Sequence, residues 1–168
     1  MRKIIIGVMG PGADAKKADI EYARRLGELI AENNWTVLSG GINKGVMSAV
    51  NEGAKSKEGT TIGVLPNDDI TTHSENLDYS IITNMKAGRN YINALSSNIL
   101  IACGVSAGTV SEIAFAIQAR KPIILINYSI FARKFLKDLG KELIYVAKNP
   151  EEAINLIKNK ILVDKNDA

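Results

Sequence analysis

The feature that most constrains the fold is a repeated alternation between short apolar runs and longer segments with helical periodicity. The first run, residues 3–9, is continuous, rich in β-branched side chains and ends at Gly10, as is typical of a strand buried on both faces. In residues 15–33, apolar or small residues recur at i, i+3 and i+4 spacing, which predicts an amphipathic helix. The chain is therefore expected to start as a strand followed by a helix.

The same alternation continues along the rest of the chain. The further strands are expected at residues 35–39, 60–65, 79–83, 98–103, 122–127 and 143–146. The further helices are expected at about residues 44–56, 89–96, 109–120, 130–139 and 150–161. About seven strands alternating with helices predict a three-layer α/β fold: a Rossmann-like, doubly wound, mostly parallel sheet with helices on both faces.

The length of the chain fits a single domain. Its 168 residues fall within the roughly 100 to 200 residues of an ordinary domain. We assign residues 1–163 to one Rossmann-like domain and expect residues 164–168 to be a frayed tail. A polar stretch without periodicity, residues 67–78, is expected to be a loop.

Composition and charge exclude several classes of function. A content of 46% hydrophobic and 23% charged residues is typical of a soluble globular protein. The net charge of +3 is scattered along the chain and forms no basic block, so a nucleic-acid partner is not expected. The N-terminal apolar run breaks at Gly7 and Gly10, too soon for a signal-peptide core, so export is not expected. No run approaches the roughly 18 apolar residues of a membrane span, so a membrane partner is not expected either.

The single cysteine and the single histidine set further limits. Cys103 cannot form an internal disulfide and fits a reducing compartment, so a cytoplasmic location is expected. Burial as a small side chain is the favoured interpretation of this residue. His73 lies in the polar stretch without partners at a recognised ligand spacing, so no metal site is expected.

Ligands of doubly wound sheets bind beyond the carboxyl ends of the strands, which directs attention to four turns. The first contains Gly10 and Gly12, which would let a ligand approach the backbone at a helix N-terminus. The turn lacks the full G-x-G-x-x-G spacing. A glycine turn that only closes the corner between strand and helix is therefore an alternative.

The second and third turns also offer polar groups. Gly40, Gly41 and Gly45 would expose several backbone N–H groups together, which favours phosphate binding; alternatively, Gly45 only lets the helix pack closely against the sheet. Arg89 stands where a helix begins, although a cation there opposes the helix macrodipole. Its position indicates a ligand contact, and a solvated or salt-bridged surface residue is the alternative.

The fourth turn, residues 103–112, is the most informative. Ser106 and Gly108 lie at the expected start of a helix, whose N-terminus can bind an anion. Thr109 and Glu112 have the spacing of a capping box, in which each side chain satisfies a backbone N–H of the other residue. A capping box would explain both residues structurally, whereas in a ligand site Glu112 would face a bound sugar.

Taken together, the last three turns resemble a known family. The residues that correspond to its motifs are, in order, Ser39-Gly40-Gly41, Gly45-Val46-Met47, Arg89 and Gly104 to Glu112. They are similar to the GGG-x-x-G-[LV]-M turn, the arginine and the P-G-G-x-G-T-x-x-E motif of the Rossmann-like nucleoside 5'-monophosphate phosphoribohydrolases, which activate cytokinins and were long mislabelled lysine decarboxylases. The resemblance spans nearly the whole chain. It implies that Arg89 and Glu112 are catalytic and that Gly108 and Thr109 bind phosphate.

The molybdenum-cofactor carrier proteins are relatives of these hydrolases, and two departures bring the sequence closer to them. Gly104-Val105-Ser106 stands where the hydrolases have Pro-Gly-Gly. The segment Met85 to Asn90 also replaces the Met-His-x-Arg-Lys motif of the hydrolases.

The resemblance implies two candidate functions. One is hydrolysis of the N-glycosidic bond of a nucleoside 5'-monophosphate to base and ribose 5-phosphate. The other is non-catalytic carriage of a pterin such as the molybdenum cofactor, or sensing of a nucleotide. Either implies a small-molecule nucleotide or pterin ligand and no required cofactor, with molybdopterin or the molybdenum cofactor as cargo in the second. Assembly as a homodimer or homotetramer is also implied.

Overall fold

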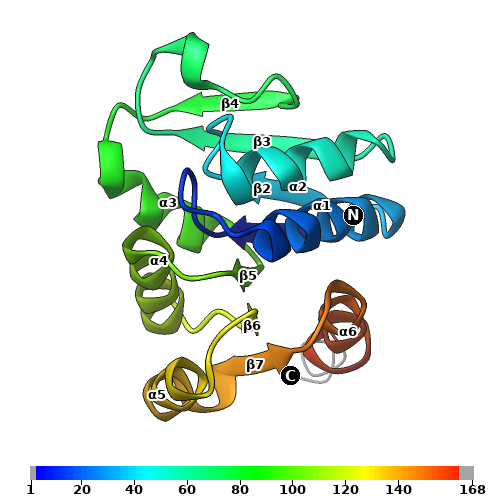
Figure 1. The fold of residues 1–168 in the computed structure, drawn as a ribbon, viewed down its shortest axis with the longest axis vertical. Helices are drawn as coiled ribbons and strands as arrows, with labels where there is room; N and C mark the ends of the chain where they lie inside the picture. Colours follow the sequence, from blue (N-terminus) through cyan, green and yellow to red (C-terminus); the bar gives the residue numbers. More distant parts are fainter. Residues whose placement is uncertain (1–2, 163–168) are drawn as a thin grey trace.

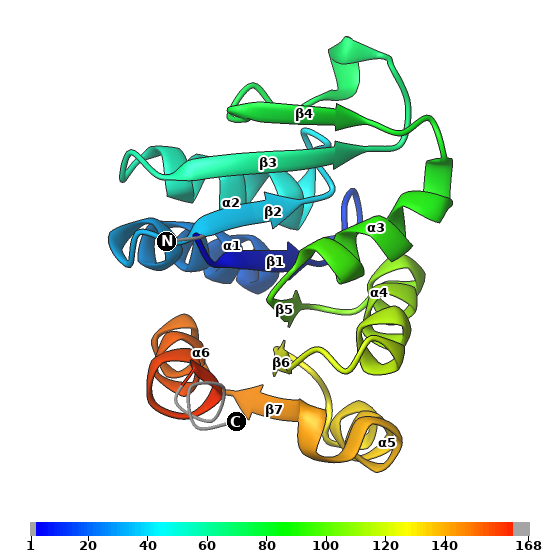
Figure 2. The ribbon, with the colours of Figure 1, turned by 180° about the vertical axis from the view of Figure 1, so that it is seen from behind.

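A computed structural model describes residues 3–162 and shows a seven-stranded parallel sheet between two layers of helices (Figures 1 and 2). The strands are β1 (Ile5–Met9), β2 (Thr36–Ser39), β3 (Thr60–Leu65), β4 (Tyr79–Ile82), β5 (Ile99–Cys103), β6 (Ile123–Ile126) and β7 (Ile144–Ala147). The helices are α1 (Lys17–Glu32), α2 (Gly45–Lys55), α3 (Arg89–Ser96), α4 (Ala107–Gln118), α5 (Ile130–Gly140) and α6 (Pro150–Leu156), which continues as a π-helical segment, Ile157–Ile161.

The order of the strands creates a switch point beside the first strand. The sheet runs β4-β3-β2-β1-β5-β6-β7, so the chain winds outward from β1 to β4 and then returns to the other side of β1. Ile6 in β1 is accordingly paired with Val37 of β2 on one side and Ile99 of β5 on the other. The carboxyl ends of β1 and β5 diverge into helices on opposite faces, which is where such sheets bind ligands.

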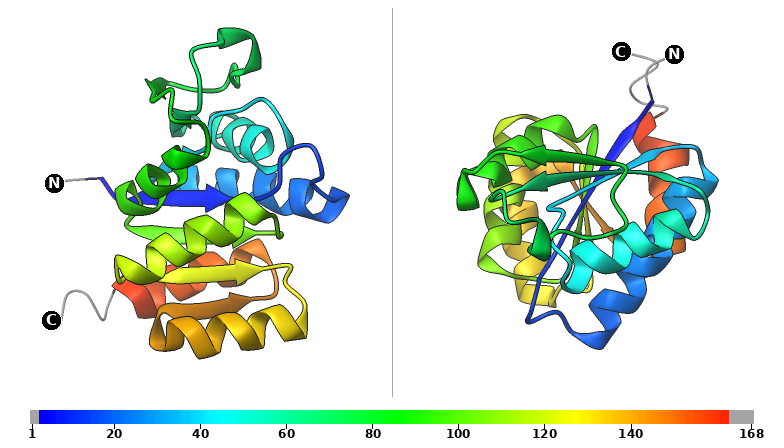
Figure 3. Two further views of the ribbon diagram at one scale, coloured as in Figure 1. Left: turned by 90° about the vertical axis from the view of Figure 1, so that its left-hand side faces the viewer. Right: turned by 90° about the horizontal axis from the view of Figure 1, so that it is seen from above.

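The two faces of the sheet hold separate cores (Figure 3). Helices α1, α2 and α6 cover one face, on which Ile6, Val8 and Ile101 are buried. Helices α3, α4 and α5 cover the other face, on which Leu38 and Leu100 are buried. Because the central strands are buried on both sides, their sequences are continuous apolar runs.

The fold class expected from the sequence is confirmed, and all the neighbouring strands of the sheet pair in parallel. The strand and helix boundaries differ from the expected ones by at most two residues when α6 is taken together with the π-helical segment that continues it. Ser129 and Asn149 cap α5 and α6 as their positions suggest, accepting from the backbone N–H of Ala132 at 3.3 Å and of Glu152 at 2.8 Å. The expected loop contains a short 3-10 helix, Ile70–Thr72, and residues 164–168 lie outside the described part of the chain.

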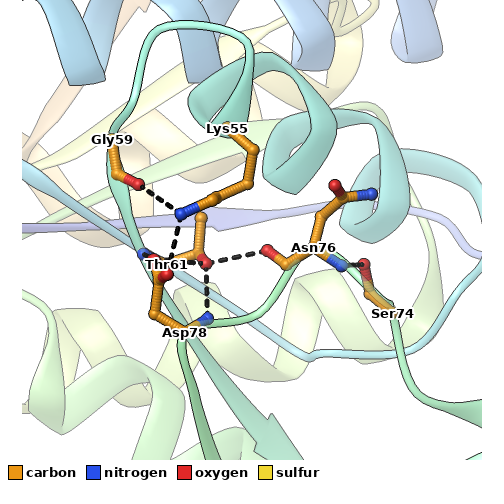
Figure 4. A network of polar contacts seen from close by, with 6 residues as sticks. All are labelled: Lys55, Gly59, Thr61, Ser74, Asn76 and Asp78. Atoms are coloured by element: carbon orange, nitrogen blue, oxygen red, sulfur yellow. Dashed lines mark hydrogen bonds and ion pairs between the residues drawn. The ribbon is translucent and has the colours of Figure 1, made fainter.

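A polar network fastens the edge strand β4 to β3 (Figure 4). The carboxylate of Asp78, just before β4, accepts from Lys55 Nζ at 2.7 Å and from the Thr61 backbone N–H at 2.9 Å. Thr61 Oγ1 donates to the Asn76 carbonyl at 2.7 Å. These bonds fix the end of the polar loop against the start of β3, so that β4 begins in register.

Candidate functional site

A cavity of about 170 Å³ opens at the switch point, between the segments that follow β1, β2 and β5 and the start of α3. Eight of the residues expected in a ligand site line it: Gly10, Gly12, Gly40, Arg89, Ser106, Gly108, Thr109 and Glu112. Three lining residues were not expected there: Met9, Met47 and Asn90. The structure therefore brings together residues from all four turns.

The other two expected glycines, Gly41 and Gly45, lie outside the lining and have local packing roles. The Gly41 N–H donates to Ser39 Oγ at 3.1 Å. Gly45 has a positive φ of 55°, and a Cβ atom there would lie 2.1 Å from the Gly12 carbonyl oxygen. Only glycine lets these two turns approach so closely, which agrees with the packing alternative for Gly45.

The Arg89 side chain is held near the carboxyl ends of β2 and β3 by two backbone carbonyls. Its Nη1 atom donates to the Gly40 carbonyl and, at 2.6 Å, to the Val64 carbonyl. Burial lowers the pKa of the Arg89 guanidinium, and the nearby Glu112 carboxyl partly opposes that shift; an arginine nevertheless stays charged in a protein. Arg89 is thus not a freely solvated surface residue, and it supplies positive charge to the cavity.

The start of α4 differs from the predicted capping box. The helix begins at Ala107, and its N-cap is Ser106, whose Oγ accepts from the Thr109 N–H at 3.2 Å and lies 2.8 Å from Thr109 Oγ1. Ser106 has extended backbone angles and a short polar side chain, both suited to an N-cap. The prediction that Thr109 and Glu112 cap each other is therefore wrong, because Glu112 lies beyond the first turn.

Glu112 is instead a buried carboxyl at the base of the cavity, with 6% of its surface exposed. Its Oε1 atom accepts from Asn93 Nδ2 at 2.7 Å. Burial raises the pKa of Glu112 to about 7, although the Asn93 hydrogen bond and the charge of Arg89 both act to lower it. A carboxyl with such a pKa can accept or donate a proton near neutral pH.

Two asparagines of α3 complete the site, and the sequence analysis missed both. Asn90 Nδ2 donates to Ser111 Oγ at 2.8 Å, which ties α3 to the first turns of α4. Asn93 lies one helical turn after Arg89 and contacts Glu112. A signal in the sequence could have identified them. Asn90 and Asn93 are three residues apart, so they share one face of α3, and asparagine is disfavoured in the interior of a helix unless it has another role.

A third missed residue, Asp19, supports the turn after β5. Its carboxylate is buried and accepts from the Lys16 N–H at 3.1 Å and from Asn127 Nδ2. Gly104 has a positive φ of 80°, and a Cβ atom there would lie 2.7 Å from the Asp19 carboxylate. Asp19 therefore packs against the glycine from which the chain enters the Ser106 turn.

Cys103 is buried in the first core, as expected. Burial raises the pKa of its thiol to about 12, which makes it a poor nucleophile. No group of three or more His, Cys, Asp or Glu residues that could hold a metal ion occurs within residues 3–162. None of the helices in that range is long and apolar enough to cross a bilayer.

The doubly wound parallel sheet and the polar cavity at its switch point define a Rossmann-like α/β protein. Within this class the chain belongs to the SLOG cluster4 family, whose model matches residues 3–154.

Two solved structures and one further relative are similar over nearly the whole chain. The molybdenum cofactor binding protein of Rippkaea orientalis is 45% identical, with a TM-score of 0.93 over 96% of this chain and 99% of that one. The molybdenum cofactor carrier protein of Chlamydomonas reinhardtii is 43% identical, with a TM-score of 0.90 over the same shares. An uncharacterized protein of Archaeoglobus fulgidus is 36% identical over 92% of this chain and 95% of its own. The expected kinship with the carrier branch is thereby confirmed.

Proposed function

We propose that this protein binds a phosphate-bearing pterin or nucleotide-like ligand in the switch-point cavity and acts as a carrier, with the molybdenum cofactor as its cargo. The observation that supports this most is the 45% and 43% identity to the two proteins described as binding or carrying that cofactor. Both similarities cover 96% of the chain, and the family match over residues 3–154 includes every residue of the cavity.

The chemistry of the cavity suits a phosphate group. Ser106 and Thr109 present hydroxyls, and the N-terminus of α4 presents backbone N–H groups that favour an anion. Arg89 adds a fixed positive charge. Gly108 lines the cavity without a side chain, and the Asn90 amide and Ser106 hydroxyl would lie only 3.7 and 3.8 Å from an added Cβ, so its backbone is accessible to a ligand oxygen.

The volume of the cavity limits how much of a ligand can be buried in it. Pockets that enclose a drug-sized ligand measure about 300 to 1,000 Å³, whereas this cavity measures about 170 Å³. It can hold the phosphate end of a nucleotide or pterin, and the ring system would extend from its mouth. A carrier gains from this arrangement, because the cargo stays accessible to the protein that receives it.

A thermal melting assay tests the binding proposal. Molybdopterin or the molybdenum cofactor at a hundred times its Kd should raise the free energy of unfolding by about 2.7 kcal/mol. AMP serves as the nucleotide comparison. If none of these compounds changed the melting temperature, the proposed ligand site would be wrong.

A second candidate function is phosphoribohydrolase activity, favoured by the presence of Arg89 and Glu112 in one cavity. Cleavage of an N-glycosidic bond passes through an oxocarbenium-like state, which a nearby carboxylate stabilises. Glu112 would bind the ribose hydroxyls or activate water, and Arg89 would position the phosphate or the leaving base. The test is incubation with AMP and detection of free adenine, with Glu112→Gln as the control; release by the wild type alone would establish the activity.

The proposal also includes self-association as a homodimer or homotetramer in the cytoplasm. Helix α5 supports it, because its outer face exposes Ile130, Phe131, Phe135 and Leu139. Phe131 is 87% exposed and Phe135 64% exposed. Large exposed apolar side chains that gather on one helix mark an interaction surface, and a second copy of the chain can cover them symmetrically.

A further inference from the structure

One polar atom beneath the cavity lacks a partner. Asn93 is completely buried, and its Nδ2 atom donates to Glu112 Oε1 at 2.7 Å. Its Oδ1 atom has no hydrogen-bond partner within residues 3–162. A buried carbonyl oxygen without a donor is unfavourable, so the arrangement calls for a donor close to Oδ1.

The group already bonded to Asn93 can supply that donor. An ionised carboxylate only accepts hydrogen bonds, whereas a protonated carboxyl has an O–H group that donates. A carboxamide and a carboxylic acid can form a cyclic pair, with N–H donating to one carboxyl oxygen and O–H donating to the amide oxygen. The first of these two bonds is present in the structure.

We propose that Asn93 is a positioning residue that holds Glu112 as a neutral carboxylic acid in the ligand-free site, with the Glu112 O–H donating to Asn93 Oδ1. For its effect on ligands this inference rests on the proposed function, but the pairing itself concerns the free protein. When Glu112 is neutral, the charge of Arg89 is unopposed and the cavity attracts anions. When Glu112 ionises, the two charges offset each other and anion binding weakens.

The surroundings of Glu112 favour the neutral form. The charged group that acts on it from α3 is Arg89, and the Glu112 carboxyl in turn acts electrostatically on the Tyr128 hydroxyl, after β6. Asp19 of α1 and Cys103 of β5 act on Tyr128. Burial outweighs the attraction of Arg89, since the pKa of Glu112 is still raised to about 7.

The pairing is tested in the ligand-free protein by infrared and NMR titration from about pH 5 to about pH 9, which brackets a pKa of about 7. Glu112→Gln assigns the Glu112 signals. At about pH 6 the wild type should show a carboxylic acid C=O stretch lowered by hydrogen bonding, and Asn93→Leu should move it to the frequency of a free acid. A fully ionised Glu112 at that pH, or a band that Asn93→Leu leaves unchanged, would overturn the pairing.

A second readout needs no substitution at Asn93. The carboxamide signals of Asn93 in the wild type should titrate with the same midpoint as the Glu112 carboxyl carbon, because one proton changes both groups. A carboxamide that does not respond would also overturn the pairing.

The consequence for ligands is tested with sulfate, which stays dianionic over this range. From about pH 6 to about pH 8 the affinity of the wild type should fall about tenfold, the ratio expected if sulfate binds only the protonated form and the pKa is about 7. Glu112→Gln should bind equally at both values. Equal wild-type affinities would overturn the coupling. An absence of sulfate binding at either pH would instead contradict the proposed phosphate site, and the spectra would still decide the pairing.

Discussion

Asn93 donates to Glu112 across 2.7 Å and thereby joins α3 to α4 directly beneath the cavity. Both side chains are buried, so the bond is shielded from water and holds the carboxyl in one position. Helix α3 contributes Arg89 from its first turn and Asn93 from its second. The packing of one helix against another therefore sets the distance between the positive charge and the carboxyl of the site.

The first prediction concerns the pH dependence of stability. The folded-state pKa of Glu112 is raised from 4.5 to about 7. Between these two pH values the Glu112 carboxyl is ionised in the unfolded chain and still protonated in the folded chain. As the pH rises through this range, the free energy of unfolding of the wild type should therefore fall, relative to that of Glu112→Gln, by about 1.4 kcal/mol per pH unit. Below pH 4.5 both states are protonated and the difference should be constant. Denaturant titrations of the wild type and Glu112→Gln at several pH values measure this difference in the free energy of unfolding. A difference that does not change with pH would refute the raised pKa of Glu112.

Replacing Arg89 should damage both the fold and the site. Arg89→Met leaves the Gly40 and Val64 carbonyls without their donor, which should cost about 1.5 to 3 kcal/mol of stability, and it should abolish sulfate binding. Arg120→Met is the matched control, because the Arg120 side chain forms an exposed ion pair with Glu142, and such pairs contribute about 0 to 1 kcal/mol. Comparable losses in the two variants would count against an anchoring role for Arg89.

Gly104→Ala should destabilise the protein by more than about 1 kcal/mol, because alanine disfavours a positive φ and its methyl group would meet the Asp19 carboxylate. Gly88→Ala is the control: its φ is −60°, and the nearest atoms to an added Cβ are 3.4 Å away. Melting temperatures separate the two cases. An unchanged melting temperature in Gly104→Ala would show that Asp19 does not constrain this turn.

The edge strand should loosen in acid. Burial acts to raise the pKa of Asp78, but hydrogen bonds from Lys55 and Thr61 outweigh it, so the pKa lies below its usual value of 3.8. The stability that Asp78 contributes is therefore present above that value and lost as the pH falls through the folded-state pKa. Asp78→Asn should show the same loosening at neutral pH. Hydrogen exchange of the β4 amides measures both, and equal protection in variant and wild type would contradict the role of this network.

Self-association should depend on α5. Phe131→Ser together with Phe135→Ser should produce a smaller species in light scattering, because both side chains are largely exposed in the single chain and would be buried in an assembly. Ile20→Ser, on α1 at the opposite face, should leave the assembly unchanged. A wild type that is monomeric at micromolar concentration would contradict the proposal directly.

The sequence was sufficient for the architecture because the periodicity of each element is a local property. Continuous apolar runs identified the buried strands, and glycine-containing turns identified the segments that line the cavity. The sequence did not predict the order of the strands, which the structure shows. Arg89 and Glu112 were assigned to one site because their motifs resemble those of a known family.

What the sequence could not supply were contacts between elements. Asn93 and Asp19 lie inside helices, away from the turns, and their roles depend on which partners the packing brings to them. The start of α4 was misplaced because Ser106 and Thr109 are both good N-caps, and only the backbone angles decide between them. In α1 the polar residue Asp19 is buried whereas the neighbouring apolar residue Ile20 is 37% exposed, an arrangement that hydrophobic periodicity does not predict.

The central claim is that the cavity around Arg89 binds the molybdenum cofactor. Equilibrium binding of the cofactor to the wild type, Arg89→Met and Arg120→Met tests it most directly. We predict that the wild type and Arg120→Met bind alike and that Arg89→Met binds at least about tenfold more weakly, which corresponds to about 1.4 kcal/mol. Equal binding by all three proteins, or no binding by any of them, would contradict the claim.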